Sequence, residues 1–560
     1  MISKPISVYI NWAAYDELSD AIELTEEIAM KQFTELIRLR KTGVRFDCYM
    51  MDAFWYDLAG GYRTWRKPHW PQGPDRWLKA CLDQGVTPGL WFSGNTLCHL
   101  ELAKEWAESL DEEGRGMCLF HGGFLAHWME SIRIWFIRGI RVIKIDFMDF
   151  TAAPTIVRRH FLPAEIRAMN VAAFREALSA LRDQCPEIII MGYNGLEEAE
   201  TQFRTDSKFR KTIDPRWLDV FDSLYCGDPR PSDVPAMNFW RSKDVYSDHM
   251  VRVYQRNGFP LSRIDNAGFM IGTTGTCFFR KTASWQGMLI LSLARGGWMN
   301  TYYGNLDLLS NEQGAWFAKV QSMFFKLQSY GRISTFGGMP GEARPYGYVA
   351  ESAEGSLITV VNPAQATEIV PLPALPSGTG YRVLFYDSGP VPAISEGGLK
   401  LGPEQMALIG MGCYNDSAYE LSRQDHMQIP SSIEPLLAEF KAAGDKVITT
   451  TVMAPKTGCI RVALRILDRT AKGWRLTGGA PPNGITLGKM LTIEAEQEGR
   501  PVPLQINYDK AIWSGLSWGV AELNVGSLRS GAPVTIRCST TEKADVELSA
   551  QLYHTIYAEA

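Results

Sequence analysis

The sequence lacks several features that would place it in a specialised class of proteins. Its ten cysteines form no Cys-x-x-Cys pair, and its eight histidines show no His-x-His or His-Glu-x-x-His spacing, so we expect no metal site. No window holds 18 consecutive apolar residues, and no basic run is present. The formal charge of −5 also disfavours a phosphate-binding surface. These absences argue against a membrane span and against a nucleic-acid partner.

Motifs for common cofactor and nucleophile chemistry are also missing. The chain contains no Gly-x-Ser-x-Gly elbow, no phosphate-binding loop and no dinucleotide-binding glycine cluster, so we expect no cofactor. Its first residues lack the basic and apolar regions of a secretory signal, and the cysteines are scattered through apolar segments. This pattern favours a cytoplasmic protein, although a trimmed leader would leave the same sequence. It leaves a homo-oligomer open.

What the chain has is length and regular alternation. With 560 residues, 46% of them hydrophobic, and 17 Trp, it predicts two to four well-packed domains with aromatic surfaces for flat ligands. Residues 1–330 alternate β-rich and helical segments, which predicts a (β/α)8 TIM barrel of class α/β. A doubly wound sheet is the alternative. Polar and aromatic residues at the carboxyl ends of the expected strands favour the barrel, because barrel enzymes build their sites there.

The expected elements of the barrel can be given by residue range. The strands are Ser7–Trp12, Val44–Asp52, Val86–Phe92, Ile140–Asp146, Glu187–Tyr193, Leu218–Cys226, Pro260–Asp265 and Trp298–Tyr303. The helices include Thr25–Thr42, Phe124–Arg138, Ala164–Asp183, Asp244–Arg256, Trp285–Arg295 and Glu312–Gln328. After Gly331 short apolar runs alternate with Pro/Gly turns, which predicts a small antiparallel β domain at 331–411 and a second β-sandwich at 412–560.

The most informative segment is the fourth expected strand, which carries two charges. Lys144 and Asp146 are two residues apart, so their side chains share one face while Ile143 and Ile145 point to the other. Buried charges are costly unless they are paired, and an ammonium keeps a neighbouring carboxylate ionised. Taken alone, the segment is consistent with a structural ion pair near a strand end. It is also consistent with Asp146 as a nucleophile, an interpretation that needs the residues further along the chain.

With these residues the chain resembles the clan D glycoside hydrolases, the melibiase-like α-galactosidases and α-N-acetylgalactosaminidases of families 27 and 36. Their fourth strand carries Lys-x-Asp with a nucleophilic Asp, which matches Lys144-Ile145-Asp146. The segment Val44–Trp55 resembles their second strand, which ends in Asp-Asp-Gly-Trp, and Gly85–Phe92 resembles their third. The resemblance covers roughly residues 6 to 410 and implies a barrel followed by a β domain.

The resemblance implies a retaining, exo-acting hydrolase of α-galactoside-like terminal sugars. Asp146 would be the nucleophile, and Asp228, after the sixth strand, would be the acid/base, with Arg230 beside it as a possible reader of sugar hydroxyls. The two would act by double displacement through a covalent glycosyl-aspartate. The substrate would be an oligosaccharide or another glycoside.

Further residues are expected to bind the sugar. Asp52 matches the first Asp of the family's second-strand motif and would hold an axial hydroxyl, whereas Ala53 replaces the second Asp and leaves the six-position of the donor open. Lys144, on the same strand face as Asp146, is also expected to bind the sugar. The remaining candidates for substrate binding, at the ends of expected strands, are Trp12, Trp55, Trp91, Asn194 and Asp265.

Three alternatives remain open at this stage. A transglycosidase of the same clan would use the same residues and transfer the sugar to another sugar. A non-catalytic carbohydrate-binding barrel would fit the altered second-strand motif and the weak fifth-strand match. A barrel aldolase would use Lys144 as a Schiff base, although a carboxylate partner would keep that lysine protonated.

Overall fold

A computed structural model of the chain describes sixteen segments. They are residues 3–12, 24–53, 55–97, 101–196, 213–227, 241–265, 269–272, 280–281, 285–373, 380–387, 389–395, 398–424, 431–468, 491–506, 518–541 and 546–557. Within them, no helix is both long and apolar enough to cross a bilayer.

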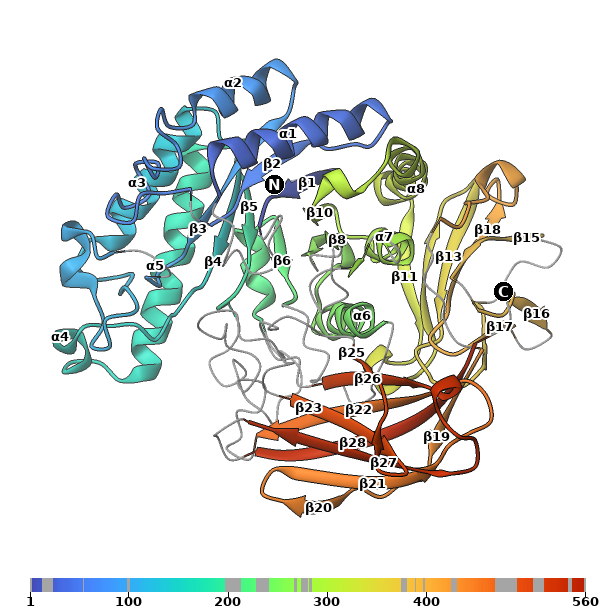
Figure 1. The fold of residues 1–560 in the computed structure, drawn as a ribbon. Helices are drawn as coiled ribbons and strands as arrows, with labels where there is room; N and C mark the ends of the chain where they lie inside the picture. Colours follow the sequence, from blue (N-terminus) through green and yellow to red (C-terminus); the bar gives the residue numbers. More distant parts are fainter. Residues whose placement is uncertain are drawn as a thin grey trace.

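The N-terminal part is a parallel sheet surrounded by helices (Figure 1). The order of its strands is β7-β6-β5-β4-β3-β2-β1-β10-β8-β9. The strands are β1 (Ile6–Ile10), β2 (Cys48–Met51), β3 (Thr87–Ser93), β4 (Val142–Asp146), β5 (Ile189–Gly192), β6 (Ser223–Tyr225), β7 (Ile264–Asp265), β8 (Phe269–Gly272), β9 (Arg280–Lys281) and β10 (Met299–Gly304). This is a TIM-like barrel, as the alternation of the sequence predicts.

Helices alternate with most of the strands, but among the described residues only a 3-10 helix lies between β5 and β6, and no helix lies between β7 and β8. They are α1 (Glu26–Lys41), α2 (Asp75–Asp83), α3 (Phe124–Ile137), α4 (Thr155–Arg158), α5 (Pro163–Gln184), α6 (Ser242–Arg256), α7 (Trp285–Ala294) and α8 (Asn311–Tyr330). Short 3-10 helices are η1 (Lys104–Ser109), η2 (Pro215–Asp219), η4 (Leu261–Arg263), η6 (Leu306–Leu308), η7 (Pro340–Glu342), η8 (Ser417–Tyr419) and η9 (Val525–Ser527).

The barrel departs from the predicted closed eightfold form at β7 and β10. Among the described residues no ladder joins these two strands, because β8 pairs with β10 along the edge that β7 would need. The side chain of Thr301 in β10 donates to Asp265 of β7, with Oγ1 and Oδ1 2.9 Å apart, and the residues just before the two strands are joined by a bond of 2.9 Å from Trp298 N to Ser262 O. The prediction of eight closed strands is therefore only partly correct.

The sixth and seventh predicted strands are also shorter than expected. The segment that leads into β6 forms η2, which starts at Pro215, and η4 precedes β7 directly after Pro260. Proline presets the backbone torsion of a first helical turn and has no N–H for a sheet ladder. Turns therefore replace the first halves of both strands.

Side chains of the barrel strands alternate between two buried layers. In β4, Ile143 and Ile145 pack in the cluster between sheet and helices, while Val142 packs in the barrel interior. Lys144 and Asp146 share the parity of Val142 and are 5% exposed each. This alternation confirms that the two charged residues lie on the same face of the strand.

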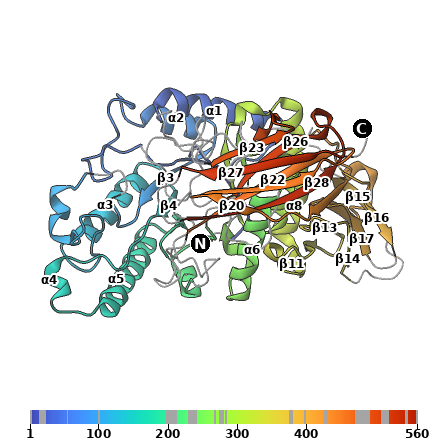
Figure 2. The same ribbon diagram turned by 60° about the horizontal axis from the view of Figure 1, so that its bottom comes forward.

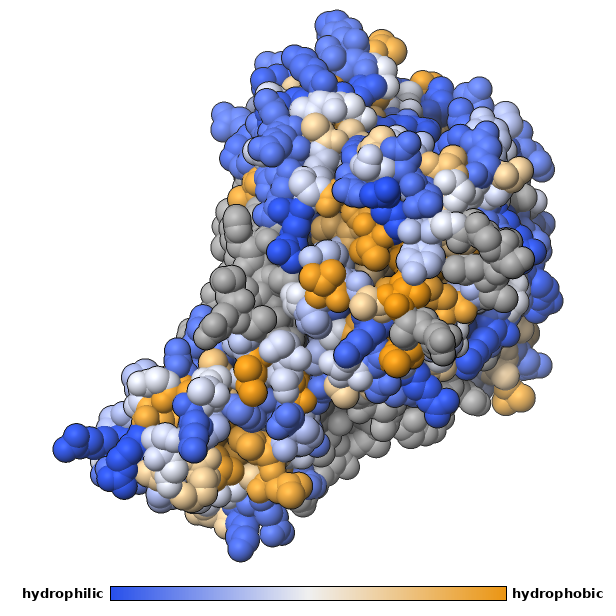
Figure 3. All heavy atoms as spheres, turned by 90° about the vertical axis from the view of Figure 1, so that its right-hand side faces the viewer, coloured by the Kyte–Doolittle hydropathy of each residue, from blue (hydrophilic) through white to orange (hydrophobic). Residues whose placement is uncertain are grey.

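A β domain follows α8. One antiparallel sheet has the order β11-β12-β13-β18-β15 and a smaller one the order β14-β17-β16. The strands are β11 (Arg332–Gly337), β12 (Tyr346–Glu351), β13 (Gly355–Val361), β14 (Glu368–Val370), β15 (Tyr381–Tyr386), β16 (Ala393–Ser395), β17 (Gly398–Leu401) and β18 (Met406–Gly412). The face of the molecule on this side is mainly hydrophilic with scattered apolar side chains (Figure 3). Val391 is one of the exposed apolar residues of this domain.

The C-terminal strands form a sandwich of two antiparallel sheets, with the orders β19-β28-β22-β26-β25 and β20-β21-β27-β23-β24. The strands are β19 (Ser432–Leu436), β20 (Lys441–Gly444), β21 (Val447–Met453), β22 (Cys459–Asp468), β23 (Leu491–Gln497), β24 (Arg500–Pro501), β25 (Gln505–Ile506), β26 (Trp518–Asn524), β27 (Pro533–Thr540) and β28 (Val546–Ile556). One continuous apolar cluster includes both the sandwich interior and barrel residues such as Val8 and Met50. The sandwich lies below the barrel and beside the β domain in Figure 1 and comes forward in Figure 2. The division at residues 330 and 411 stays a prediction.

Barrel and β domain share a buried ionic cluster. Arg241, which precedes α6, pairs with Asp387 of the β domain, and both side chains are at most 4% exposed. Arg295 Nε donates to Asp248 Oδ1 at 2.6 Å, and the Tyr348 hydroxyl of β12 donates to the same oxygen at 2.7 Å. Arg241 has its partner across the contact and Arg295 has its partner within the barrel, so the burial costs far less than it would for isolated ions.

Candidate active site

The centre of the site is a buried lysine between two carboxylates. Lys144 Nζ lies 2.8 Å from Asp52 Oδ2 and 4.0 Å from Asp146 Oδ2. The three side chains are between 3% and 7% exposed. The sequence predicts pairing of Lys144 with Asp146, but the shorter contact is with Asp52, which directly follows β2. One ammonium therefore serves two carboxylates and holds them on the same side of the barrel.

Asp146 is held by donors from three neighbouring segments. Its Oδ1 accepts from the main-chain N–H of Phe147 at 2.9 Å, from Asn194 N at 3.1 Å and from Asn194 Nδ2 at 2.9 Å. Its Oδ2 accepts from Trp91 Nε1 at 3.3 Å. Hydrogen bonds of this kind fix the orientation of a carboxylate. The residue that the resemblance marks as nucleophile is thus an oriented, buried carboxylate.

Trp91 and Trp55 are buried and do not present an exposed ring face for a sugar. Trp91 is 1% exposed, and its ring stacks on Tyr56 with centroids 5.9 Å apart. Trp55 is fully buried among other aromatic rings, and its Nε1 donates to Trp91 O at 2.8 Å. The structure therefore places Trp91 as a donor to Asp146, with Trp55 supporting it from behind. Contact of either ring with a sugar stays a prediction.

Asp52 is held through both its main chain and its side chain. Its N–H donates to Asn11 Oδ1 at 2.8 Å, and its Oδ1 accepts from Ala53 N at 2.9 Å. Burial raises the pKa of the Asp52 carboxyl, although Lys144 acts in the opposite direction. Asn11 was not among the residues expected from sequence. Its place at the carboxyl end of β1, next to Trp12, is the signal that could have identified it.

A network of hydroxyl groups lines the barrel beside Lys144. The Tyr193 hydroxyl donates to Asp265 Oδ2 at 2.7 Å and lies 2.7 Å from the Tyr303 hydroxyl. Burial, reinforced by the Asp265 charge, raises the pKa of both tyrosines well above its usual value. Lys144 Nζ lies 4.2 Å from the centroid of the Tyr193 ring, within cation–π range. Sequence reasoning missed both tyrosines, although each stands at the carboxyl end of an expected strand.

The same contacts define the position of Asp265. Its two oxygens accept from Tyr193 and from Thr301 of β10, and its side chain is almost completely buried. Asp265 therefore ties β7 to β5 and β10 in the region where the barrel has no ladder. Its expected role as a reader of sugar hydroxyls is untested.

Trp12 and the two loop candidates complete the expected set. Trp12 is half-buried after β1, and its ring meets that of Tyr303 edge-on at 6.4 Å. Asp228 and Arg230 lie outside the described residues, which stop at Gly227 after β6. The structure thus brings together Asp146, Asp52, Lys144, Trp91 and Asn194, and it leaves the acid/base residue a prediction.

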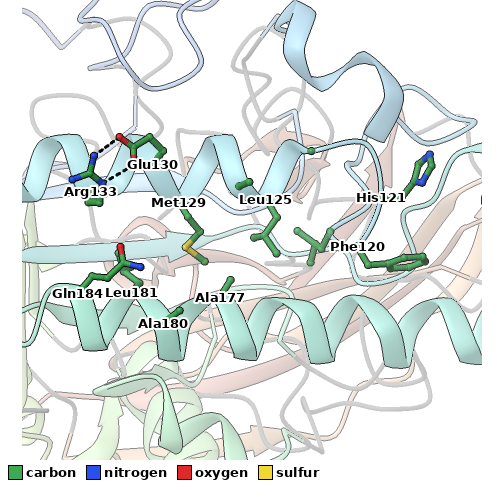
Figure 4. A pocket seen from close by; sticks show the side chains of 13 residues that line it. Phe120, His121, Leu125, Met129, Glu130, Arg133, Ala177, Ala180, Leu181 and Gln184 are labelled. Carbon is green, nitrogen blue, oxygen red and sulfur yellow. Dashed lines mark hydrogen bonds and ion pairs between the residues drawn. The ribbon is translucent and has the colours of Figure 1, made fainter.

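A separate groove lies on the outer wall of the barrel between α3 and α5 (Figure 4). Its volume is about 490 Å³, and apolar side chains such as Leu125 and Met129 line it. Its charged pair, Glu130 and Arg133, is joined by bonds of 2.6 Å. It is formed by helices rather than by strand ends, so the carboxylate site is the better candidate for chemistry. Over the described ranges, no three His, Cys, Asp or Glu side chains are grouped to hold a metal ion.

Comparisons with known proteins test the fold. No protein-family model matches the chain, and no curated protein matches its sequence. Solved structures do match. The galactosidase domain of an α-galactosidase–sucrose kinase and a family GH36 α-galactosidase from Geobacillus stearothermophilus each superpose with a TM-score of 0.51 at 12% identity. An α-galactosidase from Lactobacillus brevis gives a TM-score of 0.51 at 10% identity.

Each match covers 73% of this chain and 55% of the other, so the chain spans about half the length of these relatives. At such low identity the likeness concerns the fold and not the activity. Over about three quarters of its length, the chain has the fold of the clan D, melibiase-like glycoside hydrolases.

Proposed function

We propose that the protein is a retaining, exo-acting hydrolase of α-galactoside-like terminal sugars. The single observation that carries the proposal is the buried Asp146 carboxylate at the end of β4, held by Phe147, Asn194 and Trp91 and lying 4.0 Å from the Lys144 ammonium. A carboxylate in this state is able to attack an anomeric carbon. The proposal is supported by the position of Asp146, because barrel enzymes build their active sites at the carboxyl ends of the strands.

In the proposed reaction an oxygen of Asp146 forms a bond to the anomeric carbon as the bond to the leaving oxygen breaks. Asp228 donates the proton that the leaving oxygen takes up. Water then attacks the glycosyl-aspartate, gives its proton to Asp228 and releases both the sugar and the Asp146 carboxylate. Asp52 and Lys144 offer a carboxylate and an ammonium to sugar hydroxyls beside the reacting carbon.

The electrostatics of the site support this chemistry. The central cluster has two carboxylates for one ammonium, so it has an excess of negative charge if both are ionised. The transition state of glycoside cleavage is oxocarbenium-like and positive. Groups placed in advance where that charge develops lower the barrier without further reorganisation.

The decisive test replaces the nucleophile and restores it chemically. We expect Asp146→Gly to lose at least about 10³-fold in kcat/KM on an activated α-galactoside, because a covalent route is removed. Azide should then restore turnover and give the β-glycosyl azide. Asp228→Gly with azide should give the α-azide instead, because its nucleophile is intact. Full activity of Asp146→Gly would refute the proposal.

The same assay separates the alternatives. Transfer of the sugar to an added sugar in preference to water would indicate a transglycosidase. Tight sugar binding without turnover of any aryl glycoside would indicate a non-catalytic barrel. A Schiff-base aldolase requires an unprotonated Lys144, whereas Lys144 donates to Asp52 at 2.8 Å. Borohydride trapping with a carbonyl substrate should therefore fail.

A further inference from the structure

We propose that the Asn194–Gly195 turn is a positioning unit that occupies Asp146 Oδ1 and leaves Oδ2 as the oxygen that attacks the sugar. This inference rests on the proposed function and specifies how its nucleophile is presented. Asn194 enters the sequence-based set as a reader of sugar hydroxyls. Its contacts assign it to Asp146 instead, because both its main-chain N–H and its Nδ2 donate to Oδ1.

The two carboxylate oxygens have unequal numbers of donors. Oδ1 accepts three hydrogen bonds, of 2.9, 3.1 and 2.9 Å, whereas a carboxylate oxygen has about two lone-pair directions. Oδ2 accepts one longer bond of 3.3 Å from Trp91 and lies 4.0 Å from the Lys144 ammonium. An oxygen with three donors has no lone pair left for a carbon. Oδ2 retains a free lone pair. The Lys144 ammonium attracts this oxygen from 4.0 Å without a direct hydrogen bond.

Two left-handed backbone positions make this arrangement possible. Phe147, whose N–H donates to the preceding carboxylate, has φ of 54°, and Gly195 has φ of 95°. Met148 N donates to Asn194 O at 3.0 Å, so the turns after β4 and β5 are bonded to each other. A Cβ on Gly195 would lie 2.0 Å from Met148 O. A non-glycine residue costs about 1–3 kcal/mol in such a conformation, so Phe147 is held there by the clamp between the turns.

The chemical step follows from this division. A lone pair of Oδ2 forms the bond to the anomeric carbon, and the electron pair of the breaking bond goes to the leaving group. With a glycosyl fluoride the leaving group departs as fluoride and needs no proton from an acid. Oδ1 becomes the carbonyl oxygen of the ester and keeps its donors, which fix the plane of the carboxyl group throughout.

The first experiment uses the full chain and an α-glycosyl fluoride that the wild-type protein hydrolyses. Asn194→Ala should lower kcat/KM about tenfold, mainly through kcat, because one of the three donors to Oδ1 is lost. Asn194→Asp should lose more, because it also places a second negative charge against Asp146. Wild-type kcat/KM in both variants would overturn the proposal.

The split between kcat and KM separates positioning from a general structural effect. The Asn194 side chain donates to the carboxylate of Asp146, so its removal should lower kcat and leave KM and the thermal unfolding temperature close to the wild-type values. An equal loss in kcat, KM and thermal stability would contradict the proposal.

A second pair of variants tests the clamp through the backbone. Gly195→Ala adds a methyl group that collides with Met148 O. Gly258→Ala is the matched control, because Gly258 has φ of 92° and nothing within 4 Å of an added Cβ. Both variants carry the same torsional strain, so both should lose similar thermal stability from it. Only Gly195→Ala should also lose kcat, and equal kcat in the two variants would count against the clamp.

The final measurement locates the ester bond. A 5-fluoro-glycosyl fluoride should accumulate the glycosyl-enzyme, and a crystal structure should show the sugar on the Asp146 oxygen that faces Trp91. Attachment to the oxygen that faces Asn194 would overturn this inference and leave the proposed function intact. Failure of Asp146→Gly to lose activity would overturn both.

Discussion

The ammonium of Lys144 lies 2.8 Å from Asp52, a carboxylate from a strand that is not adjacent to its own. The contact crosses the barrel interior past β3 and couples the expected sugar-binding residue to the strand of the nucleophile. Any change at Lys144 therefore affects two carboxylates. The burial of all three groups makes these effects measurable in stability as well as in activity.

Replacing Lys144 by Met should destabilise the protein by about 3–5 kcal/mol, because Asp52 stays buried without its cation. The pKa of Asp52, already raised by burial, should rise further. A carboxyl with a raised folded-state pKa costs stability above its unfolded-state pKa and costs little below it. Chemical unfolding near pH 8 should thus show a larger loss than unfolding near pH 4.

A double variant provides the control for this prediction. Asp52→Asn combined with Lys144→Met removes both charges, so much of the lost stability should return. Activity should not return, because the sugar-binding groups are still missing. Equal stability of Lys144→Met and the double variant would show that the unpaired Asp52 carboxylate is not the source of the loss.

The Trp91 indole should stabilise Asp146 when it is released from the sugar. Trp91→Phe keeps a ring beside Tyr56 and removes the donor to Oδ2. We expect breakdown of the glycosyl-enzyme to slow by about 3- to 10-fold, because negative charge returns to Oδ2 in that step. Trp128→Phe is the matched control, since Trp128 is also buried but donates to Ser93 O. A similar slowing in both variants would contradict the assigned role.

Ala53 should set the preference at carbon six of the sugar. In the glycoside hydrolase family that the sequence resembles, an Asp at this position contacts the primary hydroxyl of the sugar. Replacement of that Asp by Ala53 favours a donor sugar that lacks the primary hydroxyl. We expect Ala53→Asp to raise kcat/KM for the hexoside relative to the matching pentopyranoside by about tenfold. Paired aryl glycosides measure this ratio. An unchanged ratio would place the carbon-six contact elsewhere in the protein.

His249 should make the contact between barrel and β domain sensitive to acid. Its Nδ1 accepts from Gly341 N at 3.0 Å, and burial lowers its pKa to about 4. The unfolded chain binds a proton there below about 6.5 and the folded chain only below about 4, so stability falls as pH drops through this window. The loss should reach about 3 kcal/mol.

His249→Asn tests this contribution, because an amide oxygen can accept the same bond without taking up a proton. The variant should lose about 3 kcal/mol less than the wild-type protein when the pH falls from 7 to 4. Parallel pH curves for the two proteins would assign the acid sensitivity to other groups.

Much of the architecture could be predicted from local pattern. Helix α1 lies within the predicted range Thr25–Thr42, and the period-two alternation around Lys144 identifies the face of β4 correctly. Strand β8, by contrast, is a four-residue segment that pairs with β10, and no local signal distinguishes it from a loop. Closure of a barrel depends on such long-range pairing, which local propensity does not encode.

The site shows the same limit. Strand alternation was sufficient to place Lys144 and Asp146 on one face, and the family resemblance added Asp52 to the site. They were not sufficient to predict which carboxylate the ammonium contacts more closely. The role of Asn194 was also out of reach, because it depends on a backbone turn at Phe147 that a bulky residue rarely adopts.

The ionic cluster around Arg241 and Asp248 limits where the chain can be truncated without loss of stability. Deleting everything after residue 330 would remove Asp387 from Arg241 and the Tyr348 hydroxyl from Asp248, which would expose a set of mismatched charges on α6 and α7. Truncated proteins for crystallisation should therefore contain both the barrel and the β domain. Chimeras that exchange domains should take these two from the same parent protein.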